Sequence, residues 1–227
     1  MSADGFAVTD AISARIGPRA DRVIAAMDRR AAREGVPTIG PAAGGWLATL
    51  ARLTGTDRAV EFGSGFGYSA YWILRGAPAC RVTLTEIDRD ELDLAREYLA
   101  AGGVADRATF EHGDAHAIVA EGSDPLDLVL VDCEKTRYAE AFETVRDRIS
   151  PGGIVVADNA VAGAGIDRDA IRAALAGKRR PDHGATGGIV AYLERIRADP
   201  AFESGLLPVG EGLAVSVRTG ESSPREH

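Results

Sequence analysis

The fold is decided by one stretch of the sequence, Val60-Glu61-Phe62-Gly63-Ser64-Gly65-Phe66-Gly67-Tyr68-Ser69. It leads from a short apolar run into a segment with helical spacing. Glycine at every second position from Gly63 to Gly67 permits positive φ angles and lets a ligand approach the backbone closely. The spacing is one residue short of the dinucleotide fingerprint G-x-G-x-x-G, and no Gly-Lys-Ser/Thr follows, which excludes a P-loop. Tight turns between a strand and a helix also use glycine for structural reasons alone, so a binding site needs further evidence.

Short apolar runs alternate with helical segments around this turn. The runs cover 59–62, 82–85, 108–112, 126–131 and 154–157, and the helical segments between them cover 68–75, 89–101, 116–121 and 138–149. Around Leu128 and Val155 the runs are apolar at successive positions, which favours parallel strands that are buried on both faces. Regular alternation of strand and helix predicts a doubly wound α/β sheet.

The two ends of the chain depart from this alternation. Helices are expected within 10–34, from Pro41 to Gly55 and over 188–197, and a β-hairpin over 206–209 and 213–217. We therefore divide the chain into an N-terminal helical cap (1–40), an α/β domain (41–219) and a polar tail (220–227). The hairpin would close the sheet with an antiparallel edge.

The composition excludes several classes of protein. The 227 residues include 34 acidic and 26 basic side chains, a formal net charge of −8, so a broad nucleic-acid-binding surface is not expected. Cys80 and Cys133 lie far apart without metal-type spacing, which excludes a disulfide scaffold and a structural zinc module. No run has the length of a membrane span, and the N-terminus has no signal-peptide pattern. The expected compartment is the cytoplasm.

Carboxylates follow the second and third apolar runs. The second run ends in Thr85-Glu86-Ile87-Asp88, and a carboxylate at this point can accept hydrogen bonds from both ribose hydroxyls of an adenosine-containing cofactor. The third run leads into Gly113-Asp114-Ala115, where Asp114 would meet the adenine, cap a helix, or do both. Together with the glycine turn, Glu86 predicts an adenosine site at the carboxyl edge of the sheet.

Oxygen-bearing side chains also follow the fourth and fifth runs, which end in Val131-Asp132 and Ala157-Asp158-Asn159. Neighbouring strands lie about 4.8 Å apart, so Asp132 and Asp158 would present two adjacent carboxylates. With the amide oxygen of Asn159 they form a set of hard ligands suited to Mg²⁺ or Ca²⁺ rather than zinc. The alternative is that both aspartates cap the segments that follow them.

Together these motifs resemble the cation-dependent S-adenosylmethionine O-methyltransferases, the family of the catechol and caffeoyl-CoA O-methyltransferases and their bacterial relatives. The resemblance runs from about residue 40 to 218 and includes Asp132-Cys133-Glu134-Lys135-x-x-Tyr138, Asp158-Asn159, and the C-terminal segments 199–203 and 207–213. It implies a Rossmann-like class I methyltransferase fold, with a mostly parallel seven-stranded sheet, an antiparallel C-terminal hairpin strand and an N-terminal helical cap. It also implies a homodimer.

The resemblance assigns roles to individual residues. It implies contacts with S-adenosylmethionine from Glu61, Gly63, Ser64, Gly65, Gly67, Tyr68, Ser69, Glu86, Asp114, Ala115, Asp132 and Tyr138. It implies Mg²⁺, or Ca²⁺ or Mn²⁺, at Asp132, Asp158 and Asn159, and catalytic roles for Asp132 and for Lys135 as the general base. Lys135 and Lys178 are the only lysines among the 26 basic residues, which favours a specific role for Lys135 over a surface position or an ion pair with Glu134.

The expected reaction is methyl transfer to a hydroxyl of a small catechol-like acceptor. The residues after Asn159 depart from the family pattern, because 160–165 are small where relatives often have bulky residues, so the acceptor itself is not defined. A hydroxylated tRNA base is the alternative acceptor, although 178–180 is the only local basic patch. A cofactor-binding protein without turnover is a second alternative, and the glycine spacing disfavours a third, a nicotinamide dehydrogenase.

Overall fold

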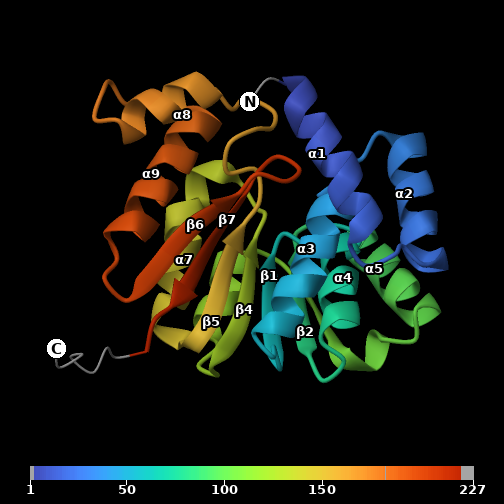
Figure 1. The fold of residues 1–227 in the computed structure, drawn as a ribbon. Coiled ribbons are helices and arrows are strands. Elements are labelled where there is room, and N and C mark those ends of the chain that lie inside the picture. Colours follow the sequence, from blue (N-terminus) through green and yellow to red (C-terminus); the bar gives the residue numbers. More distant parts are fainter. Residues whose placement is uncertain (1–2, 182, 221–227) are drawn as a thin grey trace, which may run out of the picture.

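One twisted sheet with helices on both sides forms the body of the protein in the computed structural model (Figure 1). The structure describes residues 3–181 and 183–220. Within them the sheet has seven strands in the order β3-β2-β1-β4-β5-β7-β6. The strands are β1 (Arg58–Phe62), β2 (Arg81–Glu86), β3 (Ala108–His112), β4 (Leu126–Val131), β5 (Ile149–Ala157), β6 (Phe202–Leu207) and β7 (Leu213–Arg218). β1 to β5 pair in parallel, and β7 pairs antiparallel with both β5 and β6. The expected α/β fold, mostly parallel with an antiparallel C-terminal hairpin, is confirmed.

The helices cover the two faces of the sheet. They are α1 (Ala3–Ile16), α2 (Arg22–Glu34), α3 (Gly40–Leu53), α4 (Tyr68–Gly76), α5 (Arg89–Ala101), α6 (Ala115–Glu121), α7 (Tyr138–Val145), α8 (Arg168–Leu175) and α9 (Gly184–Ala198). One hydrophobic core lies beneath α2 to α5, and a second lies beneath α6, α7 and α9. No helix in the described part of the chain is both long and apolar enough to cross a membrane.

Strand β4 shows why the central strands are apolar at successive positions. Leu128 and Leu130 point into the first core, whereas Val129 and Val131 point into the second. Successive side chains of a strand face opposite sides of the sheet, so a strand covered on both sides is typically apolar at successive positions. All four side chains are fully buried.

Helix α2 contacts the glycine turn and helices α4 and α5 through side-chain interactions. Its Arg30 donates to both carboxylate oxygens of Glu91, at 3.1 and 2.7 Å, and its guanidinium lies 4.8 Å from the ring centroid of Phe66. Tyr68, the first residue of α4, donates its hydroxyl hydrogen bond to Asp28 of α2 at 2.7 Å. The N-terminal helices therefore pack directly against the turn between β1 and α4.

Several element boundaries differ from the sequence-based expectation. The helix expected over 138–149 ends at Val145, a 3₁₀ turn follows over Arg146–Arg148, and β5 begins at Ile149. The Pro151-Gly152-Gly153 stretch conceals this start, because β5 is irregular there and pairs with β4 through a register shift.

The C-terminal region holds further differences. Helix α8 was not expected, and its eight residues bury only Ile171 and Ala174, too few for a clear period. Helix α9 starts at Gly184 rather than residue 188, and β6 covers Phe202–Leu207 rather than 206–209. As the edge strand, β6 is exposed over residues 203–206 and lacks a continuous apolar pattern. Except for Gly220, the tail expected over 220–227 lies outside the described residues.

We expect Gly76→Ala to lower the free energy of unfolding by about 1–3 kcal/mol, the usual cost of overpacking. A Cβ at Gly76 would lie 2.1 Å from the carbonyl oxygen of Ala48, so α3 and α4 would have to separate. Urea denaturation of the variant and the wild type measures the difference. Gly205→Ala is the control, because a Cβ there meets no atom within 4 Å. Equal stability of the two variants would contradict this close helix contact.

Candidate active site

The carboxyl ends of β1, β4 and β5 bring the predicted site residues to one edge of the sheet. Asp132 N donates to Phe62 O at 3.0 Å, and Asp158 N donates to Val131 O at 3.2 Å. Each aspartate therefore continues the ladder one residue beyond its strand. The backbones of Asp132 and Asp158 are neighbours, as the sequence predicts.

The glycine turn lies beside Asp132. Gly63, Gly65 and Gly67 have φ values of +80°, +47° and +81°, which side-chain-bearing residues rarely adopt. A Cβ at Gly63 would lie 2.5 Å from the carbonyl oxygen of Asp132. Glycine is therefore required here both for the backbone angle and for the close approach of the turn to β4.

Glu61 lies fully buried beneath this turn. Ser69 donates a hydrogen bond to its Oε1, and its Oε2 has no partner among the described residues. Burial raises the pKa of Glu61 well above its usual range, opposed by the Ser69 hydrogen bond and reinforced by the charges of Asp132 and Glu86. The side chain therefore links the end of β1 to the first turn of α4.

Glu86 is held at the end of β2 by backbone donors. Its Oε2 accepts from Gly65 N at 2.7 Å, and its Oε1 accepts from Ile87 N at 2.8 Å and Asp88 N at 2.9 Å. A carboxylate offers about four acceptor positions, so one more remains after these three bonds. Glu86 lines a cavity of about 330 Å³.

Two cavities divide the predicted cofactor residues between them. The larger is lined by Gly63, Glu86, Asp114, Ala115 and Asp132, among others. The smaller, of about 80 Å³, lies between the linker 36–39 and the turn, and is lined by Gly63, Ser64, Gly65, Tyr68, Ser69 and Asp132. Gly63 and Asp132 line both cavities, so they stand where the two meet. Gly67, Glu61 and Tyr138 line neither.

Asp114 caps helix α6. Its side chain accepts from His116 N at 2.8 Å, which is the helix-cap alternative raised by the sequence. Arg137 also donates to Asp114 at 2.8 Å and makes two hydrogen bonds to Glu140. The Arg137 hydrogen bond, together with the α6 backbone, lowers the pKa of Asp114. The sequence-based interpretation missed Arg137, because its partner Asp114 lies 23 residues away at the start of another helix.

Lys135 contacts Asp132 rather than Glu134. Its Nζ lies 3.0 Å from Asp132 Oδ1 and 5.0 Å from the ring centroid of Tyr138. Tyr138 is fully buried, and its hydroxyl lies 3.4 Å from the same oxygen. Glu134 instead accepts a hydrogen bond from Thr136 at 2.7 Å. The expected alternative, a Lys135–Glu134 ion pair, is replaced by a Lys135–Asp132 pair.

Asp158 is 4% exposed, and its Oδ1 has no partner among the described residues. Burial raises the pKa of Asp158 to about 7, and the charge of Asp132 contributes in the same direction. Asn159 follows with a φ of +54° and donates a side-chain hydrogen bond to Glu211. Within the described residues no three Asp, Glu, His or Cys side chains are grouped to hold a metal. The predicted metal set therefore depends on the Asn159 amide.

Glu211 is a second residue of this edge, besides Arg137, that the sequence-based interpretation missed. It lies in the turn between β6 and β7, and its charge also raises the pKa of Asp158. Its position between Gly210 and Gly212 indicated a turn but not its neighbour. Only the insertion of β7 beside β5 brings this turn to Asn159.

Cys133 is a packing residue rather than a ligand. Its sulfur lies 3.8 Å from His116 Nε2. Burial raises the pKa of the Cys133 thiol to about 12, so the thiol remains neutral near pH 7. This agrees with the expectation that a soft thiol has no place in a set of hard oxygen ligands.

Comparisons with known proteins agree with this arrangement. The model of the O-methyltransferase family matches residues 21–219. A catechol O-methyltransferase of Niastella koreensis is 30% identical over 177 residues, which is 74% of this chain and 80% of that protein. The O-methyltransferase TomG of Streptomyces achromogenes, involved in tomaymycin synthesis and solved with S-adenosylmethionine, superposes with a TM-score of 0.80 at 25% identity, covering 97% of this chain and 100% of that one.

A further solved structure shares the fold. The O-methyltransferase of Bacillus cereus, at 21% identity, superposes with a TM-score of 0.80 over 95% of this chain and 99% of that one. The family match extends over most of the chain, including the glycine turn, both strand-end aspartates and the C-terminal hairpin. The expectation of a methyltransferase is confirmed, and this chain belongs to the O-methyltransferase family.

Proposed function

We propose that this protein transfers a methyl group from S-adenosylmethionine to a hydroxyl of a small catechol-like acceptor. The reaction would use a divalent cation and Lys135 as the general base. The observation that carries the proposal is the position of Asp132. It borders both cavities, contacts Lys135, and lies beside the buried Asp158.

The two adjacent cavities, which share Gly63 and Asp132, suit the two ends of S-adenosylmethionine. Glu86 would accept from the ribose in the larger cavity, with Asp114 and Ala115 near the adenine. Ser64, Ser69 and Asp132 would contact the amino acid end in the smaller cavity. The cofactor supplies an electrophilic methyl group on a sulfonium. The TomG relative, solved with this molecule, supports the assignment.

The residues present fit a hard divalent cation such as Mg²⁺. Asp158 has a buried carboxylate oxygen without a partner among the described residues, next to the carboxylate of Asp132. Asn159 adds an amide oxygen, and such oxygens are ligands that Mg²⁺ and Ca²⁺ accept. A bound cation favours the deprotonated form of an acceptor hydroxyl, and lowering a phenol pKa from about 10 to about 7 corresponds to roughly 4 kcal/mol.

Lys135 would receive the proton of the acceptor hydroxyl as the neutral amine, the form that the charge of a cation bound beside it would favour over the ammonium. Its Nζ is held at the site by Asp132 Oδ1, by the carbonyl of Cys133 at 3.4 Å and by the face of Tyr138. These contacts restrict a side chain that is otherwise very flexible. Positioning of the acceptor, the sulfonium and the base would supply most of the rate enhancement.

The principal experiment incubates the protein with labelled S-adenosylmethionine, Mg²⁺ and a panel of catechols and monophenols. We expect methylation of catechols only, because two adjacent oxygens can bind one cation together. Excess chelator or Asp158→Ala should abolish transfer and leave the circular dichroism spectrum unchanged. Full activity in chelator would refute the cation. Inert catechols with methylation of hydroxylated tRNA would instead favour the RNA acceptor, which the net charge of −8 opposes.

We expect Lys135→Ala to lower kcat by about 10²- to 10⁴-fold, the typical effect of removing a general base. The KM for S-adenosylmethionine should change little, because Lys135 lines neither cavity. Steady-state kinetics separate the two parameters. Lys178→Ala, at the other lysine of the chain, is the matched control and should behave as the wild type. A parallel loss of cofactor affinity and rate would indicate a structural lysine.

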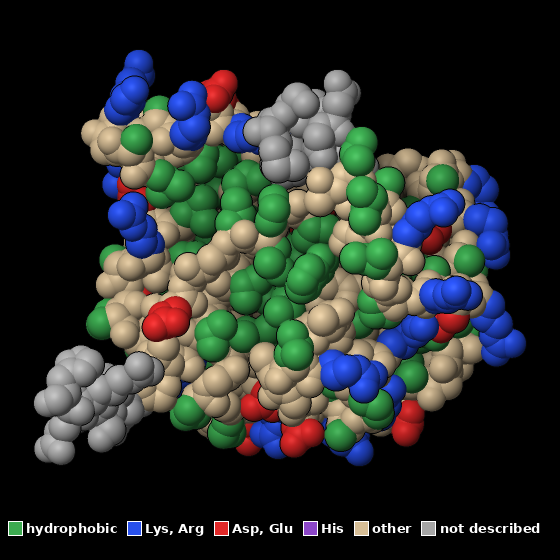
Figure 2. Space-filling view, viewed as in Figure 1, with side chains coloured by type: hydrophobic (Ala, Val, Ile, Leu, Met, Phe, Trp, Pro, Cys, Tyr) green, Lys and Arg blue, Asp and Glu red, His purple; other side chains and the backbone are tan. Residues whose placement is uncertain are grey.

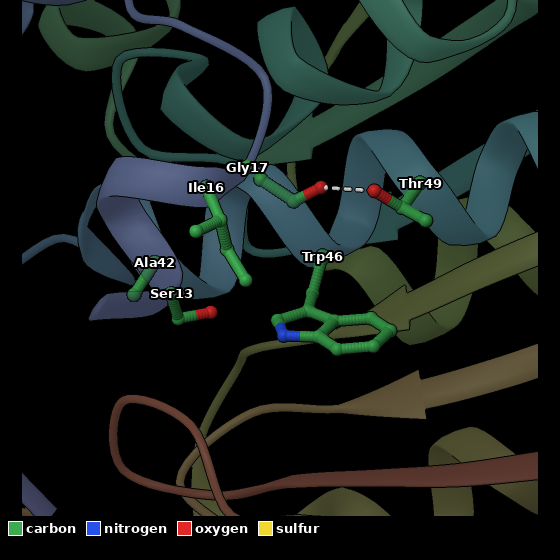
Figure 3. A pocket seen from close by; sticks show the side chains of 7 residues that line it. Ser13, Ile16, Gly17, Ala42, Trp46 and Thr49 are labelled. Carbon is green, nitrogen blue, oxygen red and sulfur yellow. Dashed lines mark hydrogen bonds between the residues drawn. The ribbon is translucent and has the colours of Figure 1, made fainter. Parts of the chain in front are cut away.

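We further propose that the protein is a homodimer paired through α1 and α3. Hydrophobic side chains gather over these helices and the β6–β7 strands on the face seen in Figure 2. Ile12 and Ile16 are 55% and 81% exposed. Beside them a pocket of about 190 Å³ is lined by Ser13, Ile16 and Trp46, among others (Figure 3). An exposed apolar side chain beside an apolar pocket suits a two-fold interface, in which the side chain of each copy enters the pocket of the other copy.

Ile12→Glu should convert the dimer to a monomer in sedimentation equilibrium, because a charge would be buried at its centre. Ile87→Glu changes an equally apolar residue, 74% exposed at the end of β2, and is the control. A wild-type monomer at all concentrations would refute the dimer.

A further inference from the structure

The turn between β6 and β7 is hydrogen-bonded to the loop that follows β5. Ala160 N donates to Gly212 O at 2.9 Å, and Val161 N and Ala162 N donate to Glu211 O at 3.2 and 3.0 Å. The antiparallel pairing of β5 with β7 therefore continues past Ala157 into the loop. These backbone hydrogen bonds fix the position of Glu211 relative to that of Asn159.

The side chains of Asn159 and Glu211 form a direct hydrogen bond, in which Asn159 Nδ2 donates to Glu211 Oε2. A carboxylate can only accept, so the amide must turn its NH₂ group toward Glu211 and its oxygen away from it. Gly163 leaves room for the pair, because a Cβ there would lie 2.9 Å from Glu211 Oε2 and 3.2 Å from Asn159 Nδ2.

The orientation of this amide decides whether Asn159 can bind a cation. An amide oxygen is a hard ligand, whereas an amide NH₂ group is a donor and cannot coordinate a cation. An asparagine side chain that lacks a fixed partner can present either group. The proposed ligand set has two carboxylates, Asp132 and Asp158, and one amide oxygen. Losing the amide oxygen would therefore remove one of the three proposed ligands.

We propose that Glu211 is a positioning residue that locks the Asn159 amide with its oxygen free for the cation. The inference rests on the proposed cation-dependent function and goes beyond it, because it assigns a role to a side chain outside the ligand set. Groups that orient metal ligands typically contribute about 10- to 100-fold to metal affinity.

Substitutions at Glu211 separate this role from a purely electrostatic one. Glu211→Gln removes the charge but keeps an oxygen that accepts from Asn159 Nδ2. Glu211→Ala removes both, and Glu211→Met keeps the length of the side chain without a comparable acceptor and substitutes for the alanine variant if that variant unfolds. Glu203→Ala, at an exposed position of β6, is the control.

Binding of Mn²⁺ to the full chain, measured by titration calorimetry, is the readout and requires no turnover. We expect Glu211→Ala to weaken Mn²⁺ by about 10- to 100-fold, and Glu211→Gln and Glu203→Ala to remain within about threefold of the wild type. In an Asn159→Ala background, Glu211→Ala should cause no further loss, because the two residues act as one unit.

Three results would overturn the proposal in distinguishable ways. Unchanged affinity in Glu211→Ala would show that the amide needs no partner. A Glu211→Gln variant as weak as Glu211→Ala would assign the effect to charge or to direct ligation. A wild-type protein that binds no Mn²⁺ would refute the cation site and this inference together, whereas the first two results leave the cation site intact.

Discussion

Three acidic side chains lie close together at the carboxyl edge of the sheet, and their mutual repulsion limits how this edge can be built. Glu61 lies in β1, and Asp132 and Asp158 directly follow β4 and β5, the next two strands in the sheet. The charge of Asp132 raises the pKa of both Glu61 and Asp158. The structure accommodates each of the three carboxyl groups differently. Glu61 is buried with a raised pKa, Asp132 is paired with Lys135, and Asp158 keeps an oxygen without a partner in the described chain. The edge is therefore polarised toward binding positive charge, as a sulfonium and a divalent cation would require.

Much of the fold could be predicted because its central strands are unambiguous. β4 is apolar on both faces, and the glycine turn after β1 has a spacing with few structural interpretations. The edge elements could not be predicted as well. β6 is exposed and lacks alternation, α8 is too short to show a period, and the start of β5 is hidden by proline and glycine.

The residues of the candidate site likewise fall into those that the sequence could predict and those that it could not. Asp132, Asp158 and Glu86 directly follow or end recognisable strands, so the sequence identifies them and their relative positions. Glu211 and Arg137 depend on which elements become neighbours in space. That information lies in the strand order, which places the last strand inside the sheet rather than at its edge.

A contact of helix α1 also depends on this strand order. Gly210 N donates to Asp10 of α1 at 2.9 Å, a contact between residues 200 positions apart, and the adjacent Glu211 contacts Asn159. Contacts of such separation form late and slow folding. During synthesis on the ribosome, β1 to β5 are made before β7, the strand that pairs with the free side of β5. The contact between Asn159 and Glu211 also cannot form until the turn before β7 has been synthesised. A nascent chain would thus expose the flank of β5 to other unpaired strands until β7 is available to pair with it, so the risk of aggregation is greatest before the hairpin is released.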